Sequence, residues 1–213
     1  ANAILEQLKS RGYADDMRCV ATGYGRICVD YADKIVTEIT CHGKGGWAIF
    51  KKNMTIIDVG GQDTKMIKVV DGQVADFLMN DKCAAGTGRF LEMMAKTMEM
   101  NLDELSKVGL SYQEDITISS MCTVFAESEV VSLIAQNKAT DDIVHGLNKA
   151  VAAKTASLVK RVGGEEAYMM TGGVAQNQGL VKTLEERLGT KLVISDKSQL
   201  CGALGAALFA TEM

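Results

Sequence analysis

The sequence predicts an α/β protein. Short apolar runs that stop at glycine are typical of strands, and residues 55–59 before Gly60 and Gly61 are the clearest example. Apolar residues that repeat at helical spacing over residues 143–162 are typical of a long helix. Asp71-Gly72 lies between two further apolar runs and supplies the positive φ values of a tight hairpin turn, so part of the sheet is antiparallel.

The first half of the chain contains most of the expected strands. Ile4, Leu5 and Leu8 lie at helical spacing, and residues 17–21 then form a short apolar run that ends in the glycine turn TGYGR. The buried strand at residues 55–59 follows. The hairpin comes next, and its strands are expected at residues 65–70 and 73–79.

The second half contains most of the expected helices, because apolar residues recur there every three or four positions. Phe90, Leu91 and Met94, for example, fall on one face. In order, the expected elements are helices at residues 89–100, 124–135 and 143–162, a strand at 167–170, a helix at 180–188, a strand at 191–194 and a helix at 204–208.

The composition excludes several classes of protein. The chain has 213 residues, 47% hydrophobic and 23% charged, which is ordinary for a soluble globular protein. A formal net charge of -4 gives no basic footprint for nucleic acid, and no apolar run approaches the ~20 residues of a membrane helix. Six cysteines without a disulfide framework spacing, beside twelve methionines, predict a reducing, cytoplasmic location.

Three glycine-rich stretches follow strands or open helices: DVGGQDTK at residues 58–65, AAGTGRF at 84–90 and TGGVAQN at 171–177. Glycine lets backbone amides approach a ligand closely, and a helix N-terminus adds partial positive charge, so phosphate is the expected ligand. Each stretch alone could be only a structural turn. None fits the P-loop pattern, and AAGTGRF lacks the third glycine of the dinucleotide fingerprint.

Taken in order, TGYGR, DVGGQD, NDKCAAGTGRF, SSMCTVFAESEV, TGGVAQN and CGALGAALFA resemble the activator ATPases of 2-hydroxyacyl-CoA dehydratases, which are related to the ATPase subunits of benzoyl-CoA reductase. The resemblance covers the whole chain. It implies a two-lobed actin-like ATPase fold of the acetate and sugar kinase, Hsc70 and actin superfamily, with ribonuclease H-like subdomains. It also implies ATP/ADP and Mg²⁺ as ligands.

The resemblance further implies a homodimer that holds one 4Fe-4S cluster at its interface. Cys83 and Cys122 have no other cysteine at metal-ligand spacing, and both lie where a loop meets an expected helix. A two-fold axis would turn two cysteines per chain into the four ligands that the cluster needs. ATP hydrolysis would then drive an electron to a dehydratase or related reductase, with reduced ferredoxin or flavodoxin as donor. Zinc is the alternative metal, but it has no redox chemistry.

The resemblance also assigns roles to nucleotide-site residues. Asp58 would hold Mg²⁺ through water, and Gln62 or Asp63 would orient the attacking water. Backbone amides at the glycine stretches would bind phosphate and adenosine. The expected nucleotide-binding residues are Gly60, Gly61, Gly86, Thr87, Gly88, Thr171, Gly172, Gly173, Asn177 and Gly202.

One departure concerns the start of the chain. The family begins with a strand and loop of the form D-x-G-S-T-x-x-K, and nothing like it occurs here, so the N-terminal part of the first lobe is expected to be missing. The expected domains are residues 1–53 as the rest of the first lobe, 54–199 as the second lobe, and 200–213 as a helix packing back towards the first lobe.

Two other functions fit the same glycine stretches. A small-molecule kinase of the same superfamily would need a substrate-binding carboxylate and no cluster, and a nucleotide-sensing interaction module would use its cysteines structurally. Of the remaining side chains, His42 and His145 are expected to be ordinary polar residues. Core or surface thiols are expected at Cys19, Cys28, Cys41 and Cys201.

Overall fold

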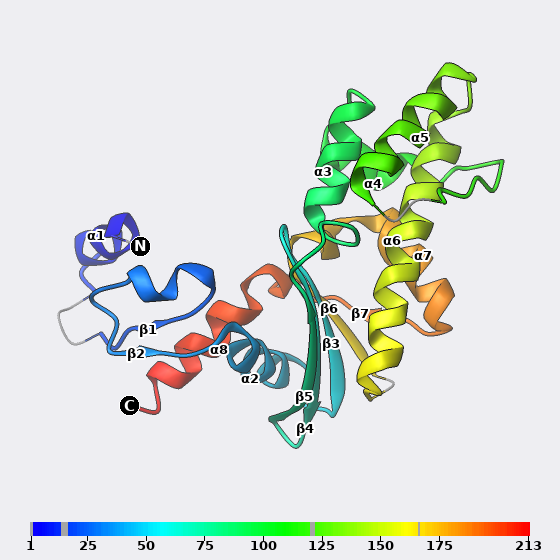
Figure 1. The fold of residues 1–213 in the computed structure, drawn as a ribbon. Coiled ribbons are helices and arrows are strands. Elements are labelled where there is room, and N and C mark those ends of the chain that lie inside the picture. The colour runs from blue at the N-terminus through cyan, green and yellow to red at the C-terminus, as the bar shows by residue number, and fades with distance from the viewer. Residues whose placement is uncertain (1, 14–16, 120–121, 166) are drawn as a thin grey trace.

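The computed structural model describes residues 2–13, 17–119, 122–165 and 167–213 (Figure 1). The helices are α1 (Asn2–Ser10), α2 (Glu38–Phe50), α3 (Gly88–Thr97), α4 (Leu102–Val108), α5 (Thr123–Ala135), α6 (Thr140–Val162), α7 (Gln178–Leu188) and α8 (Cys201–Ala210). The strands are β1 (Val20–Ala21), β2 (Lys34–Ile35), β3 (Met54–Val59), β4 (Thr64–Val70), β5 (Gln73–Asn80), β6 (Tyr168–Thr171) and β7 (Leu192–Val193). Short 3₁₀ turns are η1 (Tyr24–Cys28), η2 (Gly173–Gln176) and η3 (Ser198–Leu200).

A mixed five-stranded sheet is the centre of the molecule, with strand order β5-β4-β3-β6-β7. β4 is antiparallel to both of its neighbours, β3 and β5, whereas β6 is parallel to both of its neighbours, β3 and β7. The hairpin turn forms as predicted, with positive φ values of 49° at Asp71 and 78° at Gly72. A parallel strand that follows a helix crossover therefore lies beside an antiparallel hairpin, which confirms the α/β prediction.

Helices cover both faces of this sheet, with α2 and α8 on one side and α6 and α7 on the other (Figure 1). The side chains of β3 alternate between the two cores: Met54 and Ile56 pack with Cys201 of α8, and Ile57 and Val59 pack with the α6 and α7 side. Because side chains alternate along a strand, Asp58 must lie on the α2 side with Met54 and Ile56.

α2 was not expected from the sequence, because Gly43, Gly45 and Gly46 lower its helix propensity. Thr37 caps its start by accepting a hydrogen bond from the amide of Thr40. The glycines are there for close packing. A Cβ atom on Gly45 would lie 2.0 Å from the carbonyl oxygen of Cys201 in α8, so only glycine lets the two helix backbones meet.

The N-terminal part of the chain adds α1, η1 and the short parallel pair of β1 and β2. α8 extends from the sheet to β1, and both chain ends lie on this side of the molecule (Figure 1). The expected strand at residues 17–21 is correct only at Val20–Ala21. β2 was missed because a strand of two residues is too short to give a periodic signal in the sequence.

α3, α4 and α5 form a helical group at one end of the sheet, next to the start of α6 (Figure 1). α4 was also missed, although its capping box is visible in the sequence: Asn101 accepts from the Glu104 amide, and Glu104 accepts from the Asn101 amide. In the described ranges, no helix is both long enough and apolar enough to cross a membrane.

Candidate functional site

Three glycine loops meet at one cavity of about 390 Å³, at the end of the sheet where β3 and β6 stop. Gly61 and Gly88 line one part of it and Gly173 and Asn177 another, while Asp103 and Ser106 contribute from α4. Parallel strands present their carboxyl ends at the same edge, which explains why Gly61 and Gly173, which are more than 100 positions apart in sequence, converge here. The cavity therefore brings together the predicted phosphate and adenosine loops.

The loop after β6 needs its glycines. Gly172 has a φ of +83°, and a Cβ atom there would lie 2.3 Å from the carbonyl oxygen of Val59. Both the backbone conformation and the close approach exclude other residues. Thr171, one position earlier, is fully buried and donates to Asp58 Oδ1 at 2.8 Å. The loop is thus tied to the end of β3 by backbone packing and by a side-chain hydrogen bond.

The loop before α3 is docked onto the loop after β3. The amides of Gly88 and Arg89 donate to the carbonyl oxygens of Gly60 and Gly61, both at 2.8 Å. Thr87 is the N-cap residue, but its hydroxyl donates to the Ala84 carbonyl at 2.7 Å, and the Gly86 carbonyl accepts from Thr64 Oγ1. Gly86, Thr87 and Gly88 are all buried, but only Gly88 lines the cavity, and the first amides of α3 are already bonded.

A buried cluster of charges lies beside this cavity, on the α2 side of the sheet. Asp58 and Lys65 are cross-strand partners in β3 and β4, and Lys65 Nζ is 3.4 Å from Asp58 Oδ2. The same ammonium is 2.5 Å from Asp63 Oδ1 and 3.4 Å from Glu38 Oε1. Three carboxylates thus surround one lysine that is only 4% exposed.

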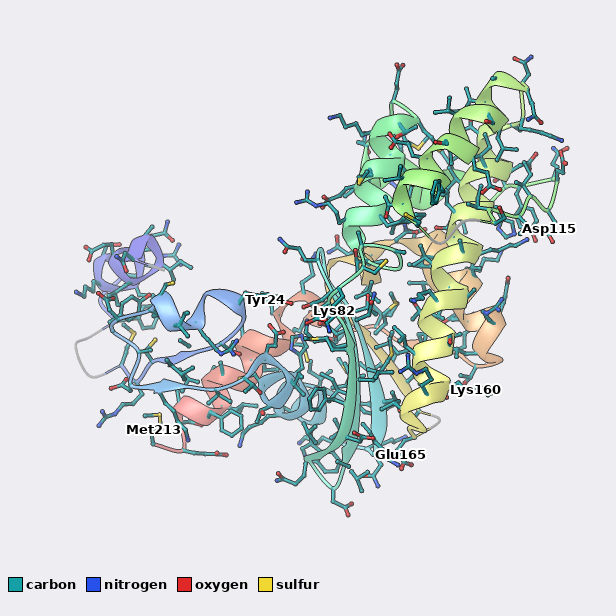
Figure 2. The ribbon with its side chains drawn as sticks, in the orientation of Figure 1. Tyr24, Lys82, Asp115, Lys160, Glu165 and Met213 are labelled. Atoms are coloured by element: carbon teal, nitrogen blue, oxygen red, sulfur yellow. The ribbon has the colours of Figure 1, made fainter. Side chains whose placement is uncertain are left out.

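Residues from η1 and α2 complete the cluster. Tyr24 extends from η1 towards the sheet and donates to Asp63 Oδ2 at 2.6 Å (Figure 2). His42 Nε2 lies 3.4 Å from Asp58 Oδ1, and its Nδ1 lies 2.9 Å from the Glu38 carbonyl oxygen. Both oxygens of Asp58 and both oxygens of Asp63 therefore have polar partners.

Asp58 and Lys65 are both charged at neutral pH. Burial alone would raise the pKa of Asp58, but His42, Lys65 and Thr171 lower it to about 2. Burial would lower the pKa of Lys65, but the surrounding carboxylates raise it above its ordinary value. Asp58 also raises the pKa of His42 against the effect of burial. The hydrogen bond to Asp63 raises the pKa of Tyr24 to about 12, so its hydroxyl stays protonated as a donor.

The remaining predicted nucleotide residues occupy different environments. Gln62 is exposed on the loop after β3, next to Gly61 in the cavity wall. Asn177 lines the cavity, but its side chain caps α7 by accepting from the Leu180 amide at 2.9 Å. Gly202 is not among the lining residues; a Cβ atom there would lie 2.9 Å from the His42 ring, so the structure places it behind the charge cluster.

The two predicted cluster cysteines are both exposed. Cys122 is the N-cap residue of α5, as expected from the sequence. Cys83 is not at a helix start, because Gly86 has a φ of +87° and the chain becomes helical only at Gly88. Its carbonyl accepts from Asn80 Nδ2 at 3.1 Å. Cys41 and Cys201 are buried and Cys28 is exposed, as expected for core and surface thiols.

Sequence reasoning missed four members of the charge cluster: Tyr24, Glu38, His42 and Lys65. Lys65 lies opposite Asp58 only because of the register between β3 and β4. Glu38 and His42 belong to α2, which was not expected because its glycines lower helix propensity. A spacing of four between Glu38 and His42 is the one available signal, since it places both on one face of a helix.

Comparisons with known proteins agree with this geometry. The sequence pattern of the BadF/BadG/BcrA/BcrD ATPase family matches residues 1–210. The 2-hydroxyisocaproyl-CoA dehydratase activator of Clostridioides difficile is 47% identical over 213 residues, which is 98% of this chain and 80% of that protein.

Two solved structures are also similar. Component A of (R)-2-hydroxyglutaryl-CoA dehydratase from Acidaminococcus fermentans superposes with a TM-score of 0.94 at 44% identity, covering 99% of this chain and 83% of that one. The activator of 2-hydroxyisocaproyl-CoA dehydratase from Clostridium difficile, solved with bound ADPNP, gives a TM-score of 0.93 at 46% identity, covering 99% and 80%. The fold is therefore the actin-like ATPase fold.

Proposed function

The chain belongs to the BadF/BadG/BcrA/BcrD ATPase family, and from this premise we propose that it is an ATP-dependent activator of a 2-hydroxyacyl-CoA dehydratase or a related acyl-CoA reductase. The observation that carries this proposal is the cavity of about 390 Å³ in which Gly61, Gly88 and Gly173 meet beside the buried carboxylates. A similar activator is described with bound ADPNP, which supports ATP as the ligand of this cavity.

In this proposal, the phosphates of ATP lie towards Gly60 and Gly61, and adenosine lies between α4 and the loop with Gly173 and Asn177. Asp58, at the end of β3, orders Mg²⁺ through water. Mg²⁺ is usually bound by one or two carboxylates together with substrate phosphates, and an ionised carboxylate here fits that pattern. Gln62 and Asp63 orient the attacking water, Gln62 from its exposed position and Asp63 through the charge cluster.

The thiols of Cys83 and Cys122 fit a shared 4Fe-4S cluster. Both are exposed, and thiolates are the ligands that such clusters need. The cluster needs four thiolate ligands, so two copies of the chain related by a two-fold axis would supply two each. When bound, the cluster supplies one-electron transfer, with reduced ferredoxin or flavodoxin as donor and the dehydratase or reductase as acceptor.

The domain assignment is part of the same proposal. Residues 1–53 belong to the first lobe, residues 54–199 form the second lobe, and residues 200–213 pack back towards the first lobe. Contacts of α8 with both α2 and β1 support the last assignment. Closure of the lobes around nucleotide would move Asp63 and the hairpin that leads to Cys83. Binding of ATP would in this way change the position of the thiol.

The test is iron content measured against oligomeric state, in protein prepared without oxygen. We expect about four iron atoms per two chains, lost completely in Cys83→Ser and in Cys122→Ser. Cys28→Ser is the matched control, because Cys28 is also exposed, and it should retain the iron. Asp58→Ala should abolish ATP hydrolysis and leave the iron in place.

Each alternative function predicts a different result. An iron-free dimer that transfers phosphate from ATP to a small molecule would support the kinase. An iron-free protein that binds ATP without hydrolysing it would support the nucleotide-sensing module. Full iron retention in Cys83→Ser would show that the ligands lie elsewhere.

A further inference from the structure

Lys65 joins three carboxylates that come from separate segments of the chain. Its ammonium lies 3.4 Å from Glu38 of α2, 3.4 Å from Asp58 of β3 and 2.5 Å from Asp63 of the loop after β3. An ammonium has three donor hydrogens and no acceptor, so three carboxylates match its bonding capacity. A lysine this deeply buried keeps its charge only where such partners surround it.

Asp63 is held from three directions. Lys65 binds its Oδ1, Tyr24 donates to its Oδ2 at 2.6 Å, and its backbone carbonyl accepts from the Gly60 amide at 3.0 Å. The carboxylate cannot rotate without breaking a charge-assisted hydrogen bond. Its position is thus fixed relative to Gly60 and Gly61, the loop that lies beside the cavity.

We propose that Lys65 and Tyr24 are positioning residues for ATP hydrolysis, which hold the carboxylates of Asp58 and Asp63 in place beside the cavity. This inference rests on the proposed ATPase function. Two carboxylates this close to one ammonium repel each other without it, so loss of Lys65 lets one of them swing away or take up a proton. Neither Lys65 nor Tyr24 lines the cavity, so both act on hydrolysis more than on nucleotide binding.

The same contacts join two parts of the chain. Tyr24 and Glu38 lie in the first 53 residues, whereas Asp58, Asp63 and Lys65 lie in the sheet and its loop. Asp63 receives both of its side-chain hydrogen bonds only when η1 is docked against the loop after β3. The Asp63 carboxylate is therefore held on both oxygens only in the docked arrangement, which couples hydrolysis to the position of the N-terminal segment.

The first test compares two lysines of β4. We expect Lys65→Met to lower kcat for Mg·ATP hydrolysis about 100-fold while KM changes less than about threefold, as expected when positioned groups move by about 1 Å. Lys68→Met is the matched control, because Lys68 is on the same strand but pairs with Glu165 away from the cavity. It should keep kcat within about twofold.

The second test uses a variant that cannot disturb the core. Tyr24 is 63% exposed, so Tyr24→Phe should fold normally and lose only the hydroxyl that holds Asp63. We expect kcat to fall about tenfold, the size expected for one hydrogen bond to a charged group. Tyr13→Phe, at another exposed tyrosine, should leave kcat unchanged. Because both positioning residues act through Asp63, the Tyr24→Phe and Lys65→Met losses should not multiply in the double variant.

The outcomes separate this inference from the proposed function. A wild-type protein that binds ADP but never hydrolyses ATP overturns the proposed function, and the inference with it. Wild-type hydrolysis together with an unchanged kcat in Tyr24→Phe overturns the inference alone. So does a loss in Lys65→Met that appears only in KM, or losses that multiply fully in the double variant. Preserved circular dichroism in each variant shows that the measured change is not unfolding.

Discussion

The crossing of α2 and α8 makes a prediction in which two physical effects have opposite signs. A glycine in a helix interior costs about 1 kcal/mol relative to alanine, so Gly205→Ala should stabilise α8 on propensity alone. The structure predicts the reverse. A Cβ atom on Gly205 would lie 1.8 Å from the carbonyl oxygen of Cys41 and 2.6 Å from its carbonyl carbon.

The magnitude follows from what would have to move. The obstacle is the backbone of α2, so no side-chain rotation relieves it, and the two helices must separate by at least about 1 Å. A gap of that size forfeits a quarter to a half of the dispersion energy between the packed surfaces. We therefore expect a loss of about 3 kcal/mol or more in the free energy of unfolding, which corresponds to a fall of about 6 to 12 °C in Tm for a chain of this size.

Urea and thermal unfolding followed by circular dichroism would measure this loss. Gly45→Ala should behave like Gly205→Ala, because its Cβ would lie 2.0 Å from the Cys201 carbonyl oxygen. Gly43→Ala should cost less, because its closest obstacle is a methyl group of Val74, which can shift. Gly25→Ala meets nothing within 4 Å and should stay within about 0.5 kcal/mol of the wild type. An unchanged or raised Tm for Gly205→Ala would refute the reasoning.

Three further predictions concern single residues of the site and core. The folded pKa of Asp58 is about 2, below its ordinary value of 3.8, so its contribution of about 2 kcal/mol is present above pH 4 and lost as pH falls through 2. Urea unfolding between pH 5 and 2 should show this loss, and Asp58→Asn should remove that part of the acid sensitivity; equal acid slopes would contradict it. Gly172→Ala places a Cβ atom 2.3 Å from the carbonyl oxygen of Val59, which should displace the loop after β6. Calorimetry should then show at least about tenfold weaker ADP binding. Unchanged affinity would show that this loop does not touch the nucleotide. Asn148 is fully buried with no described hydrogen-bond partner for its amide, so Asn148→Leu should raise stability by about 1 kcal/mol; a lower urea midpoint would contradict this.

Sequence reasoning succeeded where one local signal decides the structure. Asp71-Gly72 predicted the hairpin turn, and the short apolar run before Gly60 and Gly61 predicted the buried strand β3, which is buried on both faces. It failed for α2, because three glycines lower its helix propensity, and the close packing of Gly45 against Cys201 that compensates for this involves α8, which is distant in sequence. Local propensity cannot register a contact with residues more than 100 positions away.

The candidate site was also predictable only in part. The glycine loops that line the cavity could be located because close backbone approach requires glycine in any context. The partners of Asp58 could not. Lys65 reaches it through the strand register, and His42 through the packing of α2 against the sheet. A lysine seven residues after an aspartate has no special meaning in sequence, although in this fold it decides the charge of the cluster.

The bonds between the start of α3 and the loop after β3 also determine how motion spreads. Gly88 and Arg89 are the first two residues of α3, and both are bonded to carbonyls of that loop. A helix is stiff along its axis, so a displacement of the loop carries the whole of α3 with it, as a lever about 15 Å long. Along the chain, Gly61 and Gly88 are separated by the entire hairpin. In space, two hydrogen bonds connect the loop directly to α3, so a movement of the loop is passed to the helix through them. Hydrogen exchange at the Gly88 and Arg89 amides can therefore test this coupling. Slow exchange at both amides will show that the bonds between the loop and α3 stay closed.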